Sequence, residues 1–197
     1  AAVTPDLFAG GLAEFDYRPA EARGTFDAGQ EIVWRNQAHN GAPGVHVLTP
    51  LRLAGHPAAV LVDRGWIPYT QAEPEARSAY PAPAGEVVIT GVLRLPARRT
   101  MDFLPADPVL GPDRPRVDAW FWLDVEQIQA QVPYPLLPLV LVQTSGASAG
   151  QLPLLDFSVD LSDGPHLSYA IQWFAFAAIA LFGPLLYWRH SRRQPAG

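Results

Sequence analysis

The feature that most constrains the fold of this chain is a run without charged side chains near its C-terminus, from Leu167 to Trp188. As an α-helix the run would be about 33 Å long, at 1.5 Å per residue, which is enough to cross the hydrocarbon core of a bilayer. Gln172 is its one strongly polar interior side chain, and His166 stands at its start. We therefore predict a transmembrane helix over residues 166–188.

The charges that flank this run predict its direction across the membrane. Arginines follow the run at Arg189, Arg192 and Arg193, whereas the aspartates nearest to it lie on its N-terminal side. Positive side chains favour the cytoplasmic side, and acidic ones contribute little to the rule. We expect residues 189–197 to form a cytoplasmic tail and residues 1–165 to lie outside the cytoplasm.

The part that precedes the run has the length and composition of one compact domain. We assign residues 1–153 to a β-rich extracytoplasmic domain and residues 154–165 to a linker and helix cap, because 21 prolines favour strands and loops over long helices. The chain has no cysteine, which excludes disulfides and thiolate metal sites. Its net charge of −5 and the lack of a basic stripe argue against a nucleic-acid partner.

Short runs of alternating or β-branched residues, separated by turn signals, predict a mainly β fold, an antiparallel barrel or sandwich with short helices. The predicted extended segments are 15–26, 31–36, 45–53, 60–62, 86–95, 119–123 and 136–143. We expect the first two to pair across a turn at 27–30, and the third and fourth to form a hairpin. Residues 36–44 are predicted to be a loop that contains His39, and Asp124 to cap a short helix that runs to Gln131.

The densest cluster of polar and aromatic side chains in the domain is Asp63-Arg64-Gly65-Trp66, at the end of a predicted strand. The simpler hypothesis is structural: the arginine pairs with a carboxylate, the tryptophan packs, and the glycine allows a bulge. The functional hypothesis is contact with a partner or with the membrane surface, since Trp and Arg are enriched in the cores of interfaces.

The helix predicted for residues 166–188 has two different faces. His166, Ala170, Trp173 and Ala177 share one stripe, where small side chains would let a helix or a flat ligand approach closely. Gln172 lies off this stripe and needs a polar partner, because an unpaired amide in hydrocarbon is costly.

His166 itself is a candidate metal ligand. A cap at 162–163 would place it at the positive end of the helix dipole, which favours the neutral imidazole that ligates iron. Hydrogen bonding of His166 to lipid headgroups or to the domain is the alternative.

Several blocks in order along the chain resemble the surfeit locus protein 1 family of cytochrome c oxidase assembly factors. Residues 164–174 resemble the opening of the family's second transmembrane helix. Residues 44–51 and 60–68 resemble its two signatures in the soluble domain, and shorter matches lie at 17–19, 24–27 and 91–94. Each block is weak by itself, but their order across nearly the whole chain makes the resemblance specific.

The resemblance implies an inner-membrane protein that binds haem a and assists its insertion into subunit I of the haem–copper oxidase. It implies that His166 is the haem ligand, with Ala170, Trp173 and Ala177 as a platform beside it, and that haem a synthase is a further possible partner. Asp63–Trp66 belong to the family signature without an assigned chemistry. The family's first helix is not in this sequence, so we expect the chain to have been trimmed at its N-terminus.

Two other functions remain open from the residues themselves. The first is a scaffold that holds no haem and stabilises oxidase subunits during assembly. The second is an enzyme that uses His39 or His46 with Asp63. We expect no enzymatic activity, because no nucleophile or base stands beside an orienting group in a recognised spacing.

Overall fold

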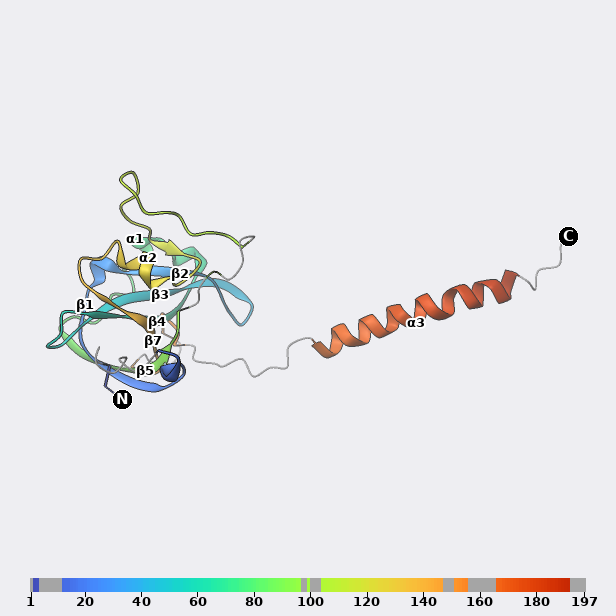
Figure 1. Cartoon of the computed structure of the whole chain (residues 1–197), viewed down its shortest axis with the longest axis horizontal. Coiled ribbons are helices and arrows are strands. Elements are labelled where there is room, and N and C mark those ends of the chain that lie inside the picture. The colour runs from blue at the N-terminus through green and yellow to red at the C-terminus, as the bar shows by residue number, and fades with distance from the viewer. Residues whose placement is uncertain are drawn as a thin grey trace. The chain divides into compact units, whose positions relative to one another are not determined.

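The computed structural model describes residues 2–3, 12–96, 99, 104–146, 151–155 and 166–191. The chain divides into two compact units, Ala1–Phe157 and Ser158–Gly197. The first unit is the β domain, and the described part of the second is the helix α3, His166–Ser191 (Figure 1).

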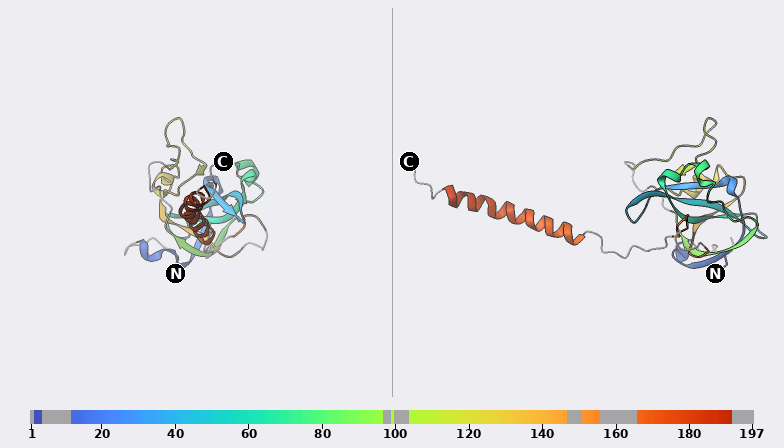
Figure 2. Two further views of the ribbon diagram at one scale, coloured as in Figure 1. Left: turned by 90° about the vertical axis from the view of Figure 1, so that its right-hand side faces the viewer. Right: turned by 180° about the vertical axis from the view of Figure 1, so that it is seen from behind.

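The β domain is built from seven strands and a few short helices. The strands are β1 (Pro19–Phe26), β2 (Ile32–His39), β3 (Ala42–Leu53), β4 (Ala59–Pro68), β5 (Glu86–Arg94), β6 (Ala119–Trp120) and β7 (Leu136–Gln143). The helices are α1 (Pro74–Arg77) and α2 (Val125–Gln129), with 3-10 turns η2 (Ala13–Phe15), η3 (Ala28–Gln30) and η4 (Tyr69–Gln71). The strands curve around a shared interior (Figure 2).

The strands form one mixed sheet in the order β1-β5-β7-β4-β3-β2-β6. The prediction of a mainly β fold is confirmed, but the prediction that it is antiparallel is wrong for two pairs. β4 pairs with β7 and β2 pairs with β6 in parallel. A parallel pair needs a long crossover, and the chain between β4 and β7, which holds β5, α1 and α2, is long enough to provide it.

The predicted pairing of residues 15–26 with 31–36 is also wrong. β1 pairs along most of its length with β5, and its last three residues pair with the end of β3. β2 pairs instead with the first part of β3. Pro50 lies where β3 exchanges β2 for β1 as its neighbour, so its missing N–H falls in the gap between the two partners.

The predicted hairpin is confirmed as β3–β4, and residues 136–143 form β7 as expected. Residues 36–44, predicted to be a loop, are instead the ends of β2 and β3 joined by a tight turn. Asn40 and Gly41 both have positive φ, which is the conformation that two-residue hairpin turns require. Asp124 caps α2 by accepting a hydrogen bond from the Glu126 N–H, as predicted.

The sequence of β4 is almost continuously apolar because both faces of this strand are buried in the core. Val60 and Val62 pack into one buried cluster with residues of β1, β5 and β7. Leu61 packs into a second cluster, on the side that α2 and Trp120 cover. Because β4 is covered on both faces, its polar residues Asp63 and Arg64 are also buried, and each needs partners inside the protein.

The helix predicted near the C-terminus is confirmed and runs from His166 to Ser191. Counting only the residues that the structure describes, no helix has both the length and the apolar character needed to span a bilayer. The crossing of a membrane by this helix stays a prediction.

Candidate functional site

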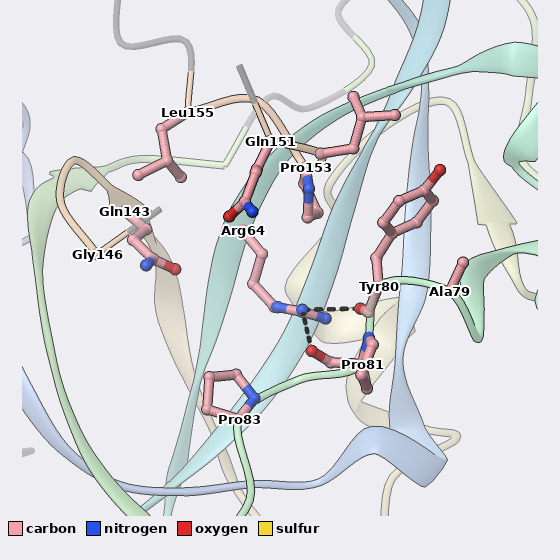
Figure 3. A pocket seen from close by; sticks show the side chains of 11 residues that line it. Arg64, Ala79, Tyr80, Pro81, Pro83, Gln143, Gly146, Gln151, Pro153 and Leu155 are labelled. Carbon is pink, nitrogen blue, oxygen red and sulfur yellow. Dashed lines mark hydrogen bonds between the residues drawn. The ribbon is translucent and has the colours of Figure 1, made fainter. Parts of the chain in front are cut away.

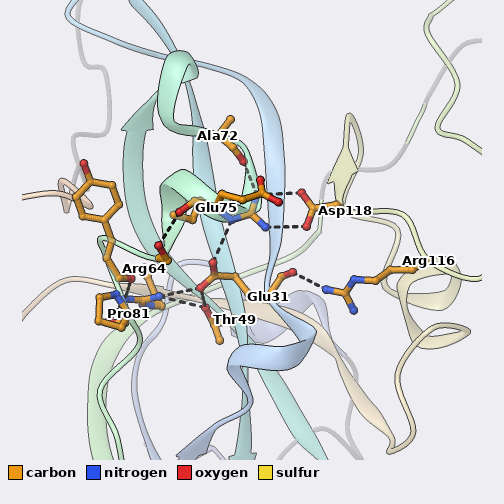
Figure 4. Close-up of polar contacts among 11 residues, drawn as sticks. Glu31, Thr49, Arg64, Ala72, Glu75, Pro81, Arg116 and Asp118 are labelled. Carbon is orange, nitrogen blue, oxygen red and sulfur yellow. Dashed lines mark hydrogen bonds and ion pairs between the residues drawn. The ribbon is translucent and has the colours of Figure 1, made fainter.

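The signature residues of β4 lie beside a buried network of charges centred on Glu31, which directly precedes β2 (Figure 4). One carboxylate oxygen of Glu31 accepts hydrogen bonds from Arg64 Nη1 and Thr49 Oγ1, both at 2.9 Å. Its other oxygen accepts from Arg77 Nε at 3.1 Å. Arg77 in turn makes a two-bond contact with Asp118, at 2.7 and 2.9 Å. The network therefore joins β2, β3, β4, α1 and the segment before β6.

The pKa values of the two buried arginines in this network are shifted in opposite directions. Burial lowers the pKa of Arg64, and the charge and hydrogen bond of Glu31 oppose that effect. Burial also acts to lower the pKa of Arg77, but the hydrogen bonds and charges of Asp118 and Glu31 outweigh it and raise the pKa. Removing one partner from such a buried pair typically costs about 3–5 kcal/mol, because the other charge is left without compensation.

Arg64 also forms one wall of a pocket of about 470 Å³ (Figure 3). Its Nη2 donates to the backbone carbonyls of Tyr80 and Pro81, each at 2.9 Å. Residues of the segment after β7 also line the pocket: Gln151, Leu152, Pro153 and Leu155. The guanidinium is thus held by protein acceptors on several sides, which supports the structural hypothesis for Arg64.

Asp63 on β4 and His46 on β3 form a second polar contact. Asp63 Oδ2 lies 2.7 Å from His46 Nδ1, and Asp63 Oδ1 accepts the N–H of Gly65 at 2.9 Å. The structure therefore brings His46 to Asp63, as the enzyme hypothesis requires. His39 lies elsewhere, with its ring 5.4 Å from the ring of Trp66.

Glycine is required at two signature positions because other chain segments approach them closely. A Cβ on Gly44 would lie 2.3 Å from the Trp66 ring, so this glycine makes room for the tryptophan. A Cβ on Gly65 would lie 2.3 Å from the Leu154 carbonyl oxygen, and Gly65 has a φ of +113°. The two signatures thus fit each other across the β3–β4 pair.

This fit fixes the segment through which the chain leaves the domain. Trp66 and Leu154 exchange two backbone hydrogen bonds of 2.8 Å as an isolated antiparallel bridge. Gly65 lets the Leu154 backbone come close enough to make them. The signature block Asp63–Trp66 is therefore the place where the domain holds the start of its connection to α3, an assignment that the composition of the block did not predict.

The other predicted site residues lie on α3. His166 is the first residue of this helix, and its side chain lies outside the described residues, as does the predicted cap at 162–163. Ala170, Gln172 and Ala177 are exposed. Trp173 is 70% exposed and makes an edge contact with the ring of Phe176, at 6.0 Å between centroids. The helix that the spacing of Ala170, Trp173 and Ala177 requires is present, and their role as a site stays a prediction.

The described residues contain no cluster of three or more metal-ligating side chains. A ligand role for His166 therefore rests on the sequence. Glu31, Arg77 and Asp118 were not among the predicted site residues. They are far apart in the chain, and no spacing between them signals that they meet.

The β domain holds its own exit segment through the backbone bridge between Trp66 and Leu154, which is called the clamp, and an apolar helix follows in the chain. These features define the class of protein: a β domain followed by a C-terminal apolar helix. The chain belongs to the SURF1 family, whose model matches residues 2–178 and so covers the domain and the first half of α3.

Related proteins match over most of the chain. A SURF1-like protein of Monosiga brevicollis is 30% identical, over 86% of this chain and 66% of the relative. Surfeit locus protein 1 of Mus musculus is 24% identical, over 93% of this chain and 61% of the relative. The human protein of that name is 23% identical, over 85% of this chain and 57% of the relative. The chain thus matches between 57% and 66% of the length of these relatives.

Proposed function

We propose that this protein is a membrane-anchored assembly factor for cytochrome c oxidase that binds haem a and assists its insertion into subunit I. The observation that carries the proposal is the family match, which runs through the domain and into α3 as far as residue 178. That range includes His166 and the stripe Ala170, Trp173 and Ala177. The resemblance of residues 164–174 to the family's second helix supports the role of His166.

The described part of α3 supports membrane anchoring. Its large apolar side chains are exposed and point in several directions around the helix, as at Ile171, Trp173, Phe174 and Ile179. Exposed apolar side chains on several sides of a helix are favourable where lipid or other helices surround them. Under the proposal, α3 lies in the inner membrane, residues 189–197 lie in the cytoplasm, and the domain lies outside.

The residues of α3 have properties that suit a flat, iron-containing ligand. Ala170 and Ala177 are small and exposed, and they flank the exposed ring of Trp173. Small side chains on one stripe leave room for a planar ring, and a tryptophan adds a stacking surface. A neutral imidazole at His166 would supply the axial nitrogen, and the haem would supply the redox-active iron.

The test is to co-express the protein with the enzymes of haem a biosynthesis and record the visible spectrum of the purified protein. We expect His166→Ala to lose most of the bound haem. His56→Ala is the matched control, because His56 lies in the β3–β4 turn of the domain, where its Nδ1 accepts the Ala58 N–H. Unchanged haem content in His166→Ala would remove His166 as the ligand.

A scaffold that holds no haem is the second candidate, and the site geometry favours it in one respect. The signature residues Asp63–Trp66 serve the domain and its exit segment, not a ligand. If the protein is a scaffold, its His166→Ala variant should still restore oxidase assembly in cells. If it is a haem-binding factor, the same variant should fail to do so. Capture of subunit I or of haem a synthase by the full chain would identify the partner in either case.

A further inference from the structure

One partly exposed surface of the β domain has no role in the network or the clamp. It consists of Arg35 on β2, Tyr69 in η4, and Phe121 and Trp122 directly after β6, and is called the Arg35 surface here. The Arg35 guanidinium lies over the Phe121 ring, 4.5 Å from its centroid, and Arg35 Nη2 is 3.4 Å from the Tyr69 hydroxyl. Within the part of the chain that is described, no carboxylate pairs with Arg35.

The aromatic rings of this surface are held in place by polar contacts to their backbone. The carboxylate of Asp107 accepts the N–H groups of both Phe121 and Trp122. Trp34 Nε1 donates to the Phe121 carbonyl at 3.1 Å, and Trp122 Nε1 donates to the Pro105 carbonyl at 2.7 Å. The rings therefore stay at the surface as a preformed platform, so little entropy is lost when something binds there.

The chain leaves the domain near this surface. Tyr69 directly follows β4, and Trp66 near the end of the same strand is bridged to Leu154 in the exit segment. Residues 158–165 then join the domain to α3. The domain is therefore covalently tethered to whatever surrounds α3.

We propose that the Arg35 surface rests on the anionic phospholipid surface of the membrane that holds α3. The proposal rests on the proposed function, because it requires α3 to be in a bilayer. Tyr and Trp carry an apolar ring and a polar edge, which suits the headgroup level of a membrane. Arg35 has donors available for a phosphate oxygen, and a guanidinium bonds phosphate strongly. A protein partner is an outcome of the test below.

The experiment uses the full chain in lipid vesicles and single cysteines, because the natural sequence has none. A fluorophore at Thr70→Cys reports on the Arg35 surface while it leaves all four residues intact. A fluorophore at Val88→Cys is the matched control, since Val88 is exposed, as Thr70 is, but lies on β5, with three strands between it and β2 in the sheet. Quenching by a nitroxide on the lipid headgroup measures contact with the membrane.

We expect the Thr70 label to be quenched more than the Val88 label in vesicles that contain phosphatidylglycerol, and Arg35→Gln to reduce this preference roughly fivefold. Added salt should weaken it as well. Equal quenching at the two positions would overturn the proposal and leave the surface to a protein partner. The proposal would also be overturned if the Arg35→Gln variant kept the same difference in quenching between the Thr70 and Val88 labels as the natural sequence. Unchanged thermal unfolding of Arg35→Gln checks that the variant folds.

A third label separates this proposal from the proposed function. Ile179 is 68% exposed on α3, so a fluorophore at Ile179→Cys should be quenched by nitroxides on the lipid acyl chains. If it is not quenched, membrane anchoring by α3 fails. If it is quenched while Thr70 and Val88 behave alike, only the proposal for the Arg35 surface fails.

Discussion

Arg64 and Arg77 in the β domain are 7% and 5% exposed, whereas Trp173 and Phe174 in α3 are 70% and 77% exposed. The domain buries charges, and the helix exposes apolar rings. In water each choice would be costly unless something compensates for it. In the domain the compensation is internal, because Glu31 and Asp118 stand opposite the arginines. For α3 the proposed function supplies the compensation, because lipid would surround the exposed apolar rings.

This difference indicates where each region's stability originates. A substitution in the Glu31 network should change the free energy of unfolding of the domain wherever the protein is. A substitution on α3 should change its distribution between membrane and water, and leave the domain as it was.

The largest effect is expected for Glu31→Ala, which leaves Arg64 without its carboxylate and Arg77 with only Asp118. The free energy of unfolding should fall by about 3–5 kcal/mol, measured by chemical denaturation of the protein in detergent. Glu86→Ala is the control, because its pair with Arg23 is exposed, and such a pair contributes only about 0–1 kcal/mol. Equal losses of unfolding free energy in the two variants would show that burial of the network adds nothing to the stability of the domain.

A charge on α3 should act on membrane partition and not on the domain. Ile179→Arg should lower the share of protein in the membrane fraction, since an arginine at the centre of a spanning helix costs about 2.5–3.5 kcal/mol. Domain unfolding should be unchanged. Ile179→Leu should behave like the natural sequence. A lower unfolding midpoint for the domain in Ile179→Arg would contradict the separation of the two regions.

The clamp is tested by Gly65→Ala, because Gly65 has a positive φ and an added Cβ would lie 2.3 Å from the Leu154 carbonyl oxygen. The strained backbone alone costs about 1–3 kcal/mol. Gly41→Ala is the matched control, because Gly41 also has a positive φ, of +79°, but nothing lies within 4 Å of its added Cβ. Faster proteolysis near Leu154 in Gly65→Ala than in Gly41→Ala would support the clamp. Identical cleavage of the two variants would count against it.

The smallest effect concerns pH. Burial, followed by the hydrogen bond and the charge of Asp27, raises the pKa of Tyr134 above its ordinary value of 10.0. A phenol whose pKa is higher in the folded than in the unfolded state stabilises the fold fully below pH 10. That contribution is lost as the pH rises from this value towards the folded pKa. The chain has no lysine, so tyrosines dominate titration in this range.

Tyr134→Phe should therefore show a weaker loss of stability above pH 10 than the natural sequence. At neutral pH it should lose about 0.5–1.5 kcal/mol, because the hydrogen bond to Asp27 is removed. Denaturation midpoints between pH 8 and about 11 measure both effects. Parallel pH curves for the two proteins would show that Tyr134 does not carry the alkaline dependence.

Local patterns predicted the elements that depend on neighbouring residues. Residues 136–143 are a β-branched and leucine-rich run, and β7 covers the same range. Asp124 caps α2 because a short carboxylate next to a free N–H is a local arrangement. The helix that starts at His166 was predicted from its unbroken apolar composition.

Pairing was predicted less well, because it depends on contacts that are distant in sequence. The turn at 27–30 joins β1 and β2 in sequence, but β1 pairs instead with β5 and with the end of β3. The parallel position of β7 beside β4 follows from a crossover that no local signal marks. Asp63–Trp66 were identified as a cluster, but the partners that define their role were not.

Strand, helix and turn signals act over a few residues, so the sequence was enough to predict a β-rich domain, a C-terminal apolar helix and the motifs of the family. The folded structure was needed to see that Glu31, from outside every motif, pairs with Arg64 and Arg77, and that Trp66 and Gly65 hold Leu154. Buried charges and close backbone approaches are set by which distant segments meet in the folded core, and the order of residues along the chain does not record those encounters.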